Sequence, residues 1–406
     1  MEIKRRPILE TSRKERKALK ILAIGYSVRH IVCSGSRAGY EMYAADAFGD
    51  VDTRRCATRY FPLNPLQLHA DVKHLKAEIE EADGIIISSG FESADFGFLT
   101  VKDRKKIVGN TPELTKEVSN KAWLSSRLDD LGIPHPLSYT GREIAEGEGE
   151  WEEKAKLKDF HYPVVAKPVY GGGGTANFFC IDERELIHWA KFFPDFLFQE
   201  YINGTHASVS LISTEHEAIS VSVNEQLIGL DSVYAPGPFA YCGNISPFVT
   251  KSSERVCEIA EFLTTELGLV GSNGIDFVVT DDVPFVIEVN PRFQGSLDTV
   301  ELSTGLNLNL VDASMKAVRG DLLVERVEAK RYAAKTIVFA RQEGVVIGNL
   351  DRGVQGIVDI PEKGRVVKQG EPIATGIGIG NSRAEAVAEA MSNVKRIKAG
   401  VRSKKE

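Results

Sequence analysis

The sequence predicts a protein of mixed α/β and α+β class, in which an alternating strand–helix lobe precedes strand-rich regions. Short apolar runs alternate with a helical pattern over residues 21–110. Strands dominate from 162 to about 289, with helical patterns near 183–193 and 252–267. From about 331, short apolar segments with glycine turns lead to one amphipathic helix. Strand–helix alternation is typical of a doubly wound parallel sheet, whereas consecutive strands favour an α+β arrangement.

Length and charge limit the functional classes that need consideration. The chain has 406 residues, which corresponds to about two or three domains of ordinary size. A formal net charge of −7 argues against extended nucleic-acid binding, because neutralising phosphates requires a basic surface. Apolar runs stay shorter than the roughly 18 residues of a transmembrane helix, and no apolar segment follows the basic N-terminus. We therefore expect a cytoplasmic protein with neither a membrane nor a nucleic acid as partner.

The five cysteines are expected to be free thiols. They occupy positions 33, 56, 180, 242 and 257, and none of them belongs to a CxxC motif. A chain of this length buries enough apolar surface to fold without covalent staples. The spacing fits the reducing conditions of the cytosol better than a disulfide framework or a zinc site.

The N-terminal lobe has the pattern of a small Rossmann-like domain. Its predicted strands cover 21–24, 40–45 and 84–89. A helical pattern over 66–81 lies between the second and the third strand. The lobe lacks GxGxxG, so a dinucleotide is not indicated. Ligands of such sheets bind beyond the carboxyl ends of the strands, which nominates the loops 25–29 and 46–50.

The remainder of the chain divides at changes in pattern. Thr111 followed by Pro112 predicts a helix start, and that helix should run to about Asp130. Residues 141–156 are rich in Glu and Gly and are interpreted as a solvated connector. The predicted parts are a basic arm at 1–20, a Rossmann-like domain at 21–110, a central domain at 111–330 and a C-terminal part at 331–406. The arm is interpreted as solvated charge, with an RNA-binding or acidic-partner role as the weaker alternative.

Residues 274–292 predict a β-hairpin that gathers oxygen ligands. Two apolar strands flank an Asp-Asp turn, and a turn centred on Asp282 places Asp276 opposite Glu288. Asn290 lies two residues after Glu288 and therefore shares its face. Two carboxylates and an amide suit a hard divalent cation such as Mg²⁺ beside nucleotide phosphates, although acidic residues facing water would give the same spacing. Arg292 follows, in a position to meet a phosphate or an acyl phosphate.

A second segment combines a strand lysine with four glycines. Lys167 stands in a Val-rich strand, where burying its charge is costly unless an anion is present. Glycines 171–174 let backbone N–H groups approach phosphates, although a flexible turn is the simpler alternative. The order of lysine and glycines is not that of a Walker A motif. Residues 196–204 read as a strand whose freed backbone could contact an adenine edge.

Taken together, these segments resemble the ATP-grasp superfamily. The resemblance rests on Lys121, then Lys167-Pro168 with the glycines, then Gln199-Glu200-Tyr201-Ile202-x-Gly204, then Asp276 and Glu288-Val289-Asn290-Pro291-Arg292. It spans residues 21 to about 400 and implies a Rossmann-like lobe, a two-subdomain ATP-grasp fold and a small β-rich C-terminal part. Its known chemistry is the activation of a carboxylate as an acyl phosphate, which an amine then attacks.

The resemblance also assigns roles to residues of this sequence. The implied phosphate-binding residues are Lys121, Lys167, Gly171, Gly172, Gly173 and Gly174. The implied adenine and ribose contacts are Glu200, Tyr201 and Ile202. The implied ligands of Mg²⁺ or Mn²⁺ are Asp276, Glu288 and Asn290. The implied catalytic residues are Arg292 and Lys167. Many relatives have Glu at the first metal position, so Asp276 departs from the pattern.

A closer resemblance concerns the N-terminal loops. The segments 25–29, 38–40 and 46–50 look like the branch called predicted ATP-dependent carboligases. Ser27 and Arg29 follow the first strand, and we expect Arg29 to bind a substrate carboxylate, with an ordinary loop charge as the alternative. Residues 354–380 are similar to the β-rich end of biotin-carboxylase-like chains.

The leading hypothesis is an ATP- and Mg-dependent carboxylate–amine ligase that yields ADP and phosphate. Its partners would be a small carboxylate and an amine, and homodimers are common in the superfamily. One alternative is a carboxylase or carbamoyl-phosphate-type enzyme that forms carboxyphosphate from bicarbonate. Another is a nucleotide-binding protein without turnover.

Overall fold

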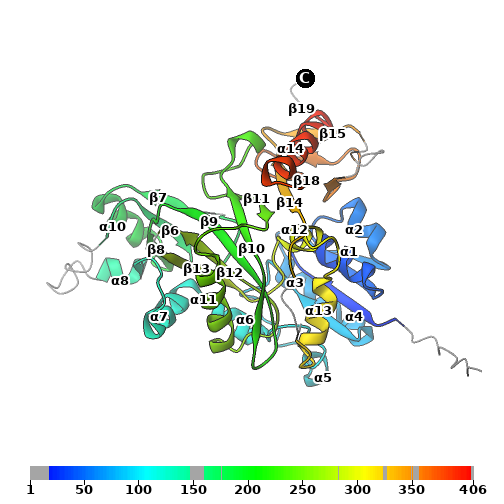
Figure 1. Ribbon diagram of the computed structural model, residues 1–406, viewed down its shortest axis with the longest axis horizontal. Coiled ribbons are helices and arrows are strands. Elements are labelled where there is room, and N and C mark those ends of the chain that lie inside the picture. Colours follow the sequence, from blue (N-terminus) through cyan, green and yellow to red (C-terminus); the bar gives the residue numbers. More distant parts are fainter. Residues whose placement is uncertain are drawn as a thin grey trace, which may run out of the picture.

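The computed structural model describes residues 18–146, 160–174, 176–281, 283–322, 327–348, 350 and 356–403. Most of the predicted arm at 1–20, part of the predicted connector and the turn residue Asp282 therefore lie outside the described residues. Figure 1 shows the N-terminal lobe at one end of the molecule, a small sheet with α8 and α10 at the other, and a large sheet between them. Among the described residues, no helix combines the length and apolar character needed to cross a bilayer.

The N-terminal lobe is a four-stranded parallel sheet, as its pattern predicts. The strand order is β3-β2-β1-β4, with bounds Arg59–Pro62, Glu41–Asp46, Lys20–Ile24 and Gly84–Ile87. Its helices are α1 Arg29–Arg37, α2 Val51–Cys56, α3 Leu68–Asp71, a 3₁₀ turn Val72–His74, α4 Lys76–Glu81 and α5 Val101–Arg104. The helical pattern predicted over 66–81 is present, but as α3, the 3₁₀ turn and α4 and not as one continuous helix. The chain turns at Leu75, and Val72, Leu75 and Ile79 all enter the core of the lobe.

A second unit is built around four antiparallel strands in the order β5-β8-β6-β7. These strands are Ser138–Thr140, Phe196–Glu200, Val164–Pro168 and Phe178–Cys180. Helices α8 Gly141–Glu146 and α10 Glu183–Phe192 pack on this sheet. The preceding helices, α6 Pro112–Val118 and α7 Lys121–Leu131, bury side chains in a core shared with the large sheet. The predicted helix over 111–130 is divided in two, because Asn120 accepts hydrogen bonds from the N–H groups of Ala122 and Trp123 and begins a new helix. Within the predicted connector, residues 141–146 are helical.

The large sheet has eight strands, and all its neighbouring pairs are antiparallel. Their order is β13-β12-β9-β10-β11-β14-β18-β16. The bounds are β9 Thr205–Ser213, β10 Ala218–Ile228, β11 Tyr241–Ser246, β12 Gly271–Val279, β13 Pro284–Asn290, β14 Tyr332–Phe339, β16 Ile357–Val358 and β18 Pro372–Gly380. The C-terminal segment thus continues the sheet of the central part across the predicted boundary near residue 330, and the four-part division stays a prediction.

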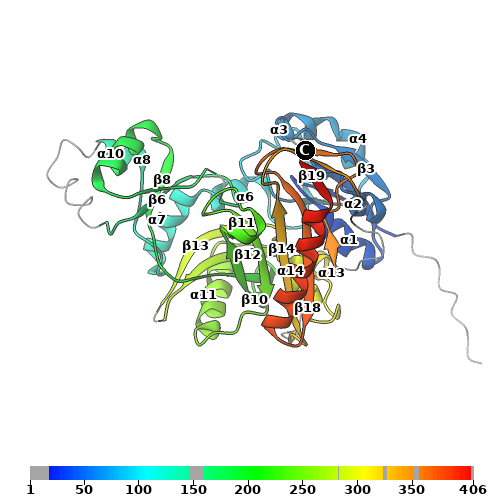
Figure 2. The same ribbon diagram turned by 90° about the horizontal axis from the view of Figure 1, so that it is seen from above.

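Helices cover this sheet, and a small sheet closes the C-terminal part. The remaining helices are α11 Ser253–Glu266, the 3₁₀ turn Asp231–Val233, α12 Leu297–Ser303, α13 Leu310–Ala317 and α14 Arg383–Ala399. The small sheet consists of β15 Gly344–Val346, β17 Val366–Val367 and β19 Val401–Ser403. In Figure 2, α14 lies along β14 and β18. Its amphipathic sequence buries Ala386, Ala390, Val394 and Ile397.

The N-terminal lobe shares a hydrophobic core with the end of the central region. One cluster contains Ile21 and Ile31 of the lobe together with Phe293, Leu297 and Val311. Burying such side chains is worth roughly 1.5–3 kcal/mol each. The lobe is therefore fused to α12 and α13 rather than joined by a linker.

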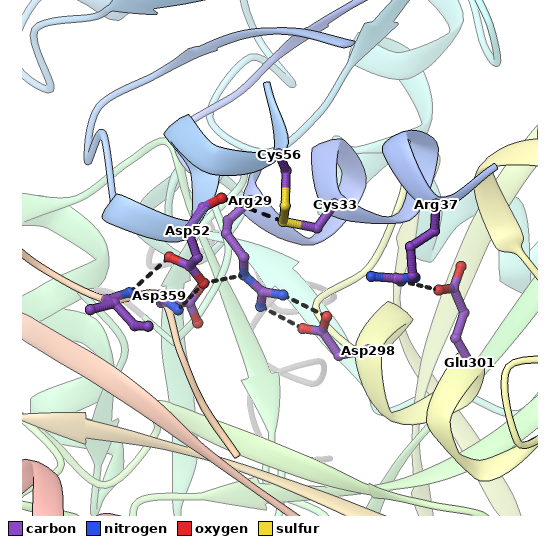
Figure 3. The surroundings of a disulfide bond; sticks show 9 residues. Arg29, Cys33, Arg37, Asp52, Cys56, Asp298, Glu301 and Asp359 are labelled. Atoms are coloured by element: carbon purple, nitrogen blue, oxygen red, sulfur yellow. Dashed lines mark hydrogen bonds and ion pairs between the residues drawn. A yellow bond between two sulfur atoms is a disulfide. The ribbon is translucent and has the colours of Figure 1, made fainter. Parts of the chain in front are cut away.

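A buried ion-pair network lies beside this core (Figure 3). The Nη1 and Nη2 atoms of Arg29 each donate to a carboxylate oxygen of Asp298 at 2.6 Å, and its Nε donates to Asp359 at 2.8 Å. Asp52 of α2 accepts the backbone N–H groups of Asp359 and Ile360 at 2.9 and 3.0 Å. Lys335 Nζ lies 3.1 Å from Asp298. Burial alone would raise the pKa of Asp298, but Arg29 and Lys335 hold it well below the ordinary value.

The expectation of five free thiols is wrong. Cys33 of α1 and Cys56 at the end of α2 form a disulfide, whereas Cys180, Cys242 and Cys257 are thiols (Figure 3). The 23-residue separation spans strand β2, after which α2 packs beside α1. The packing of α1 against α2 brings these sulfur atoms together. The absence of a CxxC motif could not exclude this disulfide, because its cysteines are far apart in the sequence.

Loss of the Asp298 charge is expected to destabilise the protein strongly. Removing one side of a buried pair costs about 3–5 kcal/mol, because the partner charge stays buried. Asp298→Asn should therefore lower the free energy of unfolding by about 3 kcal/mol, measured by urea denaturation. The control is Arg54→Met, which breaks the exposed pair between Arg54 and Glu362 and should cost less than about 1 kcal/mol. Equal losses in the two variants would contradict the role of the network.

The disulfide can be tested by counting thiols. Iodoacetamide added to denatured, unreduced protein should label three cysteines, and prior reduction should raise the number to five. Peptide mapping should recover the Cys33–Cys56 cross-link, and Cys33→Ser should make Cys56 reactive. Five labels without reduction would show that the two cysteines are thiols in solution.

Candidate functional site

The predicted hairpin carboxylates lie side by side. Strands β12 and β13 pair with Asp276 directly opposite Glu288, which confirms the predicted register. The Nδ2 atom of Asn290 donates to Asp276 at 3.2 Å and to Glu288 at 3.4 Å. Gln294 packs against Gly274, where any Cβ would overlap it, and donates to Asp276 at 3.4 Å. Four polar side chains therefore meet on one face of the sheet.

The two carboxylates repel each other and titrate as a pair. Burial and the charge of Glu288 raise the pKa of Asp276 well above its ordinary value. Burial would also raise the pKa of Glu288, but Lys121, Lys167 and Arg292 together hold it below its ordinary value. Two adjacent carboxylates and an amide are a donor set suited to Mg²⁺ or Mn²⁺. Asn290 would have to turn its Oδ1 toward such a cation.

Two lysines approach this pair, one from α7 and one from strand β6 of the small sheet. Lys121, the first residue of α7, places Nζ 3.3 Å from Glu288 and donates to the carbonyl oxygen of Gly171 at 2.7 Å. Lys167 of β6 donates to Gln199 at 2.7 Å. Burial and the charge of Lys121 lower the pKa of Lys167 to about 7, although Glu288 and Asp276 oppose that shift. An anion beside Lys167 would restore its charged form.

The glycine loop adopts a backbone that other residues disfavour. Gly171, Gly173 and Gly174 have φ values of +117°, +69° and +72°. A Cβ on Gly174 would lie 1.7 Å from the carbonyl oxygen of Phe239, and the carbonyl of Gly173 accepts the N–H of Tyr241 at 3.2 Å. The loop is thus docked on the segment before β11, which a merely flexible turn would not require.

The end of β8 holds the residues predicted to contact adenine. Glu200 pairs with Val164 in the sheet, and its carboxylate lies 2.6 Å from Nδ1 of His161. The N–H of Tyr201 donates to Pro163 at 3.2 Å, and half-buried Ile202 follows. Their assignment to adenine and ribose stays a prediction.

Arg292 meets a carboxylate that the sequence did not reveal. Its Nε donates to Glu92 at 2.7 Å, and Glu92 lies in the loop after β4. Both side chains line a small cavity together with Lys121, Glu288 and Asn290. Ligands of such sheets bind beyond the carboxyl ends of the strands, and on that basis the sequence analysis selected the loops after β1 and β2. The same reasoning applied to the loop after β4 would have included Glu92.

The expectation for Arg29 is not supported by this geometry. Its guanidinium is buried and binds Asp298 and Asp359 of the protein itself, so it has an internal partner where a substrate carboxylate was expected. Arg29 is the first residue of α1, and its guanidinium faces Asp298 of α12. Ser27 lies half-buried in the preceding loop.

Comparison with known proteins identifies the central region. Residues 118–296 match the family described as the ATP-grasp domain. The chain contains an ATP-grasp domain. All predicted site residues except Ser27 and Arg29 fall inside the matched range. The predicted resemblance to this superfamily is confirmed, whereas the carboligase branch stays a prediction.

The similarity extends beyond the ATP-grasp domain. An uncharacterized protein of Methanocaldococcus jannaschii is 28% identical over 373 residues, which cover 88% of this chain and 87% of the relative. Biotin carboxylase from Campylobacter jejuni superposes with a TM-score of 0.73 at 18% identity, covering 91% of this chain and 89% of the other. L-amino acid ligase from Bacillus licheniformis gives 0.67 at 19% identity, with coverages of 95% and 98%. These structures share the fold.

The glycine loop of the ATP-grasp domain should not accept a side chain at Gly174. Gly174→Ala adds a Cβ that would overlap the carbonyl oxygen of Phe239, and its positive φ alone costs roughly 1–2 kcal/mol. We expect a lower thermal midpoint and faster proteolysis within 169–180. Gly237→Ala is the control, because its new Cβ would meet no atom within 4 Å. Identical behaviour of the two variants would contradict the docking of the loop.

Proposed function

We propose that this chain is an ATP- and Mg-dependent ligase that activates a carboxylate as an acyl phosphate and joins it to an amine, releasing ADP and phosphate. The observation that carries the proposal is the cavity at the hairpin, where Lys121, Glu288, Asn290 and Arg292 converge beside Gly171. Two cations for phosphates, Lys121 and Arg292, meet the proposed metal ligands Glu288 and Asn290 in this cavity. Lys167 and Asp276 lie next to Glu288, so the groups that phosphoryl transfer requires are close together.

Each group has a role that follows from its position. Lys121 and Lys167 would neutralise phosphate oxygens, and Lys167 would regain its proton as the phosphates approach. Asp276, Glu288 and Asn290 would hold Mg²⁺ or Mn²⁺, which when bound neutralises phosphate charge during transfer. The glycine loop would close over the phosphates and exclude water.

Arg292 would serve the reacting carboxylate. Its guanidinium can hold a carboxylate oxygen beside the terminal phosphate and then stabilise the charge of the transferred group. An oxygen of the carboxylate attacks the terminal phosphorus and ADP departs. The amine next attacks the acyl carbon, a C–N bond forms, phosphate leaves and the nitrogen gives up a proton. Orientation and charge neutralisation suffice for these steps, and a protein nucleophile is not required.

The same cavity could serve bicarbonate as the carboxylate. The fold similarity to biotin carboxylase supports keeping that substrate in the test. Ligation to an amine remains our proposal because the L-amino acid ligase matches a larger share of both chains. A homodimer is a further expectation that the proposal does not need.

The proposed reaction predicts substrate-dependent formation of ADP. Purified protein with Mg·ATP should release ADP when pooled carboxylates and amines are added, and Glu288→Gln should lower the rate by at least about 10²-fold through loss of a metal ligand. Glu258→Gln is the control, because Glu258 pairs with Arg255 on the exposed face of α11. ADP formed with bicarbonate alone would indicate a carboxylase, and AMP with pyrophosphate would refute the proposed chemistry.

A further inference from the structure

The loop after β4 holds Glu92 rigidly at the edge of the hairpin cavity. Phe91 is buried in the core of the N-terminal lobe, against Phe96. Gly90 has a φ of +89°, and its N–H donates to Oε2 of Glu92 at 2.9 Å. The carbonyl oxygen of Gly90 in turn lies 3.0 Å from Nε2 of His69. One carboxylate oxygen of Glu92 is therefore fixed by its own lobe, which leaves the other to contact the ATP-grasp domain.

That second oxygen determines the orientation of Arg292. Oε1 of Glu92 accepts from Nε of Arg292 at 2.7 Å, and both side chains are only 14% exposed. Nη1 donates to the carbonyl oxygen of Phe293 at 3.2 Å. With these two contacts made, Nη2 lies beside Gly172, 3.6 Å from the place a Cβ would occupy there. The guanidinium therefore presents its outer edge to the glycine loop.

The alternative partners of Arg292 are the hairpin carboxylates. Arg292 lines the same cavity as Glu288, and Asp276 is directly opposite Glu288 in the sheet. Without Glu92, the guanidinium would gain most by turning toward these two carboxylates, which the proposed function assigns to the metal. A long flexible side chain in a cavity needs such a competing contact to remain in one rotamer.

We propose that Glu92 is a positioning residue through which the N-terminal lobe holds Arg292 toward the transferred phosphoryl group and away from the metal ligands. The inference rests on the proposed function. Glu92 acts only through Arg292 and does not itself touch the reacting atoms. The lobe thereby contributes to phosphoryl transfer from outside the matched ATP-grasp range.

A double-mutant cycle tests this role. With the substrate pool that yields ADP in the wild type, Glu92→Ala should lower kcat by about 10²-fold, the usual consequence of a misplacement near 1 Å, with the KM for ATP changed less than about twofold. Glu92→Gln keeps the acceptor and should retain more activity than Glu92→Ala. In an Arg292→Lys background the effect of Glu92→Ala should largely disappear, because the two residues act as one unit. Glu362→Ala, which frees the surface residue Arg54, is the control.

Some outcomes would overturn the proposal. Unchanged kcat in Glu92→Ala, a loss confined to KM, or equal losses with and without Arg292 would show that Glu92 does not act through Arg292. A merely structural loop would lower the thermal midpoint in both backgrounds alike.

A chemical readout separates this proposal from the proposed reaction. Phenylglyoxal modification of Arg292, followed by peptide mass spectrometry, requires no substrate. Glu92→Ala should change the rate of this modification by at least about fivefold in either direction, because the guanidinium exchanges its contact with Glu92 for the hairpin carboxylates. If no pool yields ADP but the reactivity of Arg292 changes in the variant, the ligase proposal fails and the positioning role of Glu92 stands. If ADP forms but the reactivity of Arg292 is unchanged, the positioning role of Glu92 is refuted and the ligase proposal stands.

Discussion

The buried ion pair between Arg29 and Asp298 determines how the parts of this molecule are placed. Removing two charges from water is costly, and it is offset only where every remaining donor and acceptor finds a partner. Asp298 receives both terminal nitrogens of Arg29 and also Lys335, while Asp359 receives Nε. Any relative shift of α1, α12 or the segment around Asp359 would leave a buried charge uncompensated. Asp52 also holds the segment around Asp359 in place, because its carboxylate accepts the backbone N–H groups of Asp359 and Ile360.

The position of the N-terminal lobe affects the proposed site in two ways, through the chain that joins Arg292 to α12 and through the large sheet. Arg292 precedes α12 by only a few residues, so a lobe held against α12 also holds Glu92 against Arg292. Across the large sheet, buried polar groups continue from the hairpin toward β14. Asn224 donates to Ser208 at 3.3 Å and accepts from Ser246 at 2.6 Å. A satisfied polar network of this kind is rigid because each member constrains its neighbours. The network therefore helps to keep the hairpin and β14 at a fixed separation.

The sequence was most informative where the chemistry is local. The pairing of Asp276 with Glu288 was predicted from a turn centred on Asp282, and alternating apolar runs reveal the parallel lobe. The pairs nearer the turn, such as Val279 with Pro284, are one residue out of that register, and a bulge between Asp276 and Phe277 restores it. Contacts between distant segments could not be predicted in the same way. The Cys33–Cys56 disulfide and the partners of Arg29 cannot be predicted from sequence spacing, because both depend on how helices pack. Glu92 stands between these cases, since its loop position was predictable but its partner, 200 residues away, was not.

Charge balance explains why the proposed site is self-consistent before any ligand enters. Three basic side chains, Lys121, Lys167 and Arg292, face three carboxyl groups, Glu92, Asp276 and Glu288. Burial lowers the pKa of Lys167 and raises that of Asp276, so loss of both charges leaves the balance even. Under the proposed function, nucleotide phosphates would compete with Glu288 for Lys121, which would leave the hairpin carboxylates with excess negative charge. That excess is what favours a divalent cation. Binding of the anion and of the cation would therefore strengthen each other reciprocally. Glu92 is excluded from this exchange because its other oxygen is held by Gly90, so Arg292 keeps its orientation while the lysines change partners.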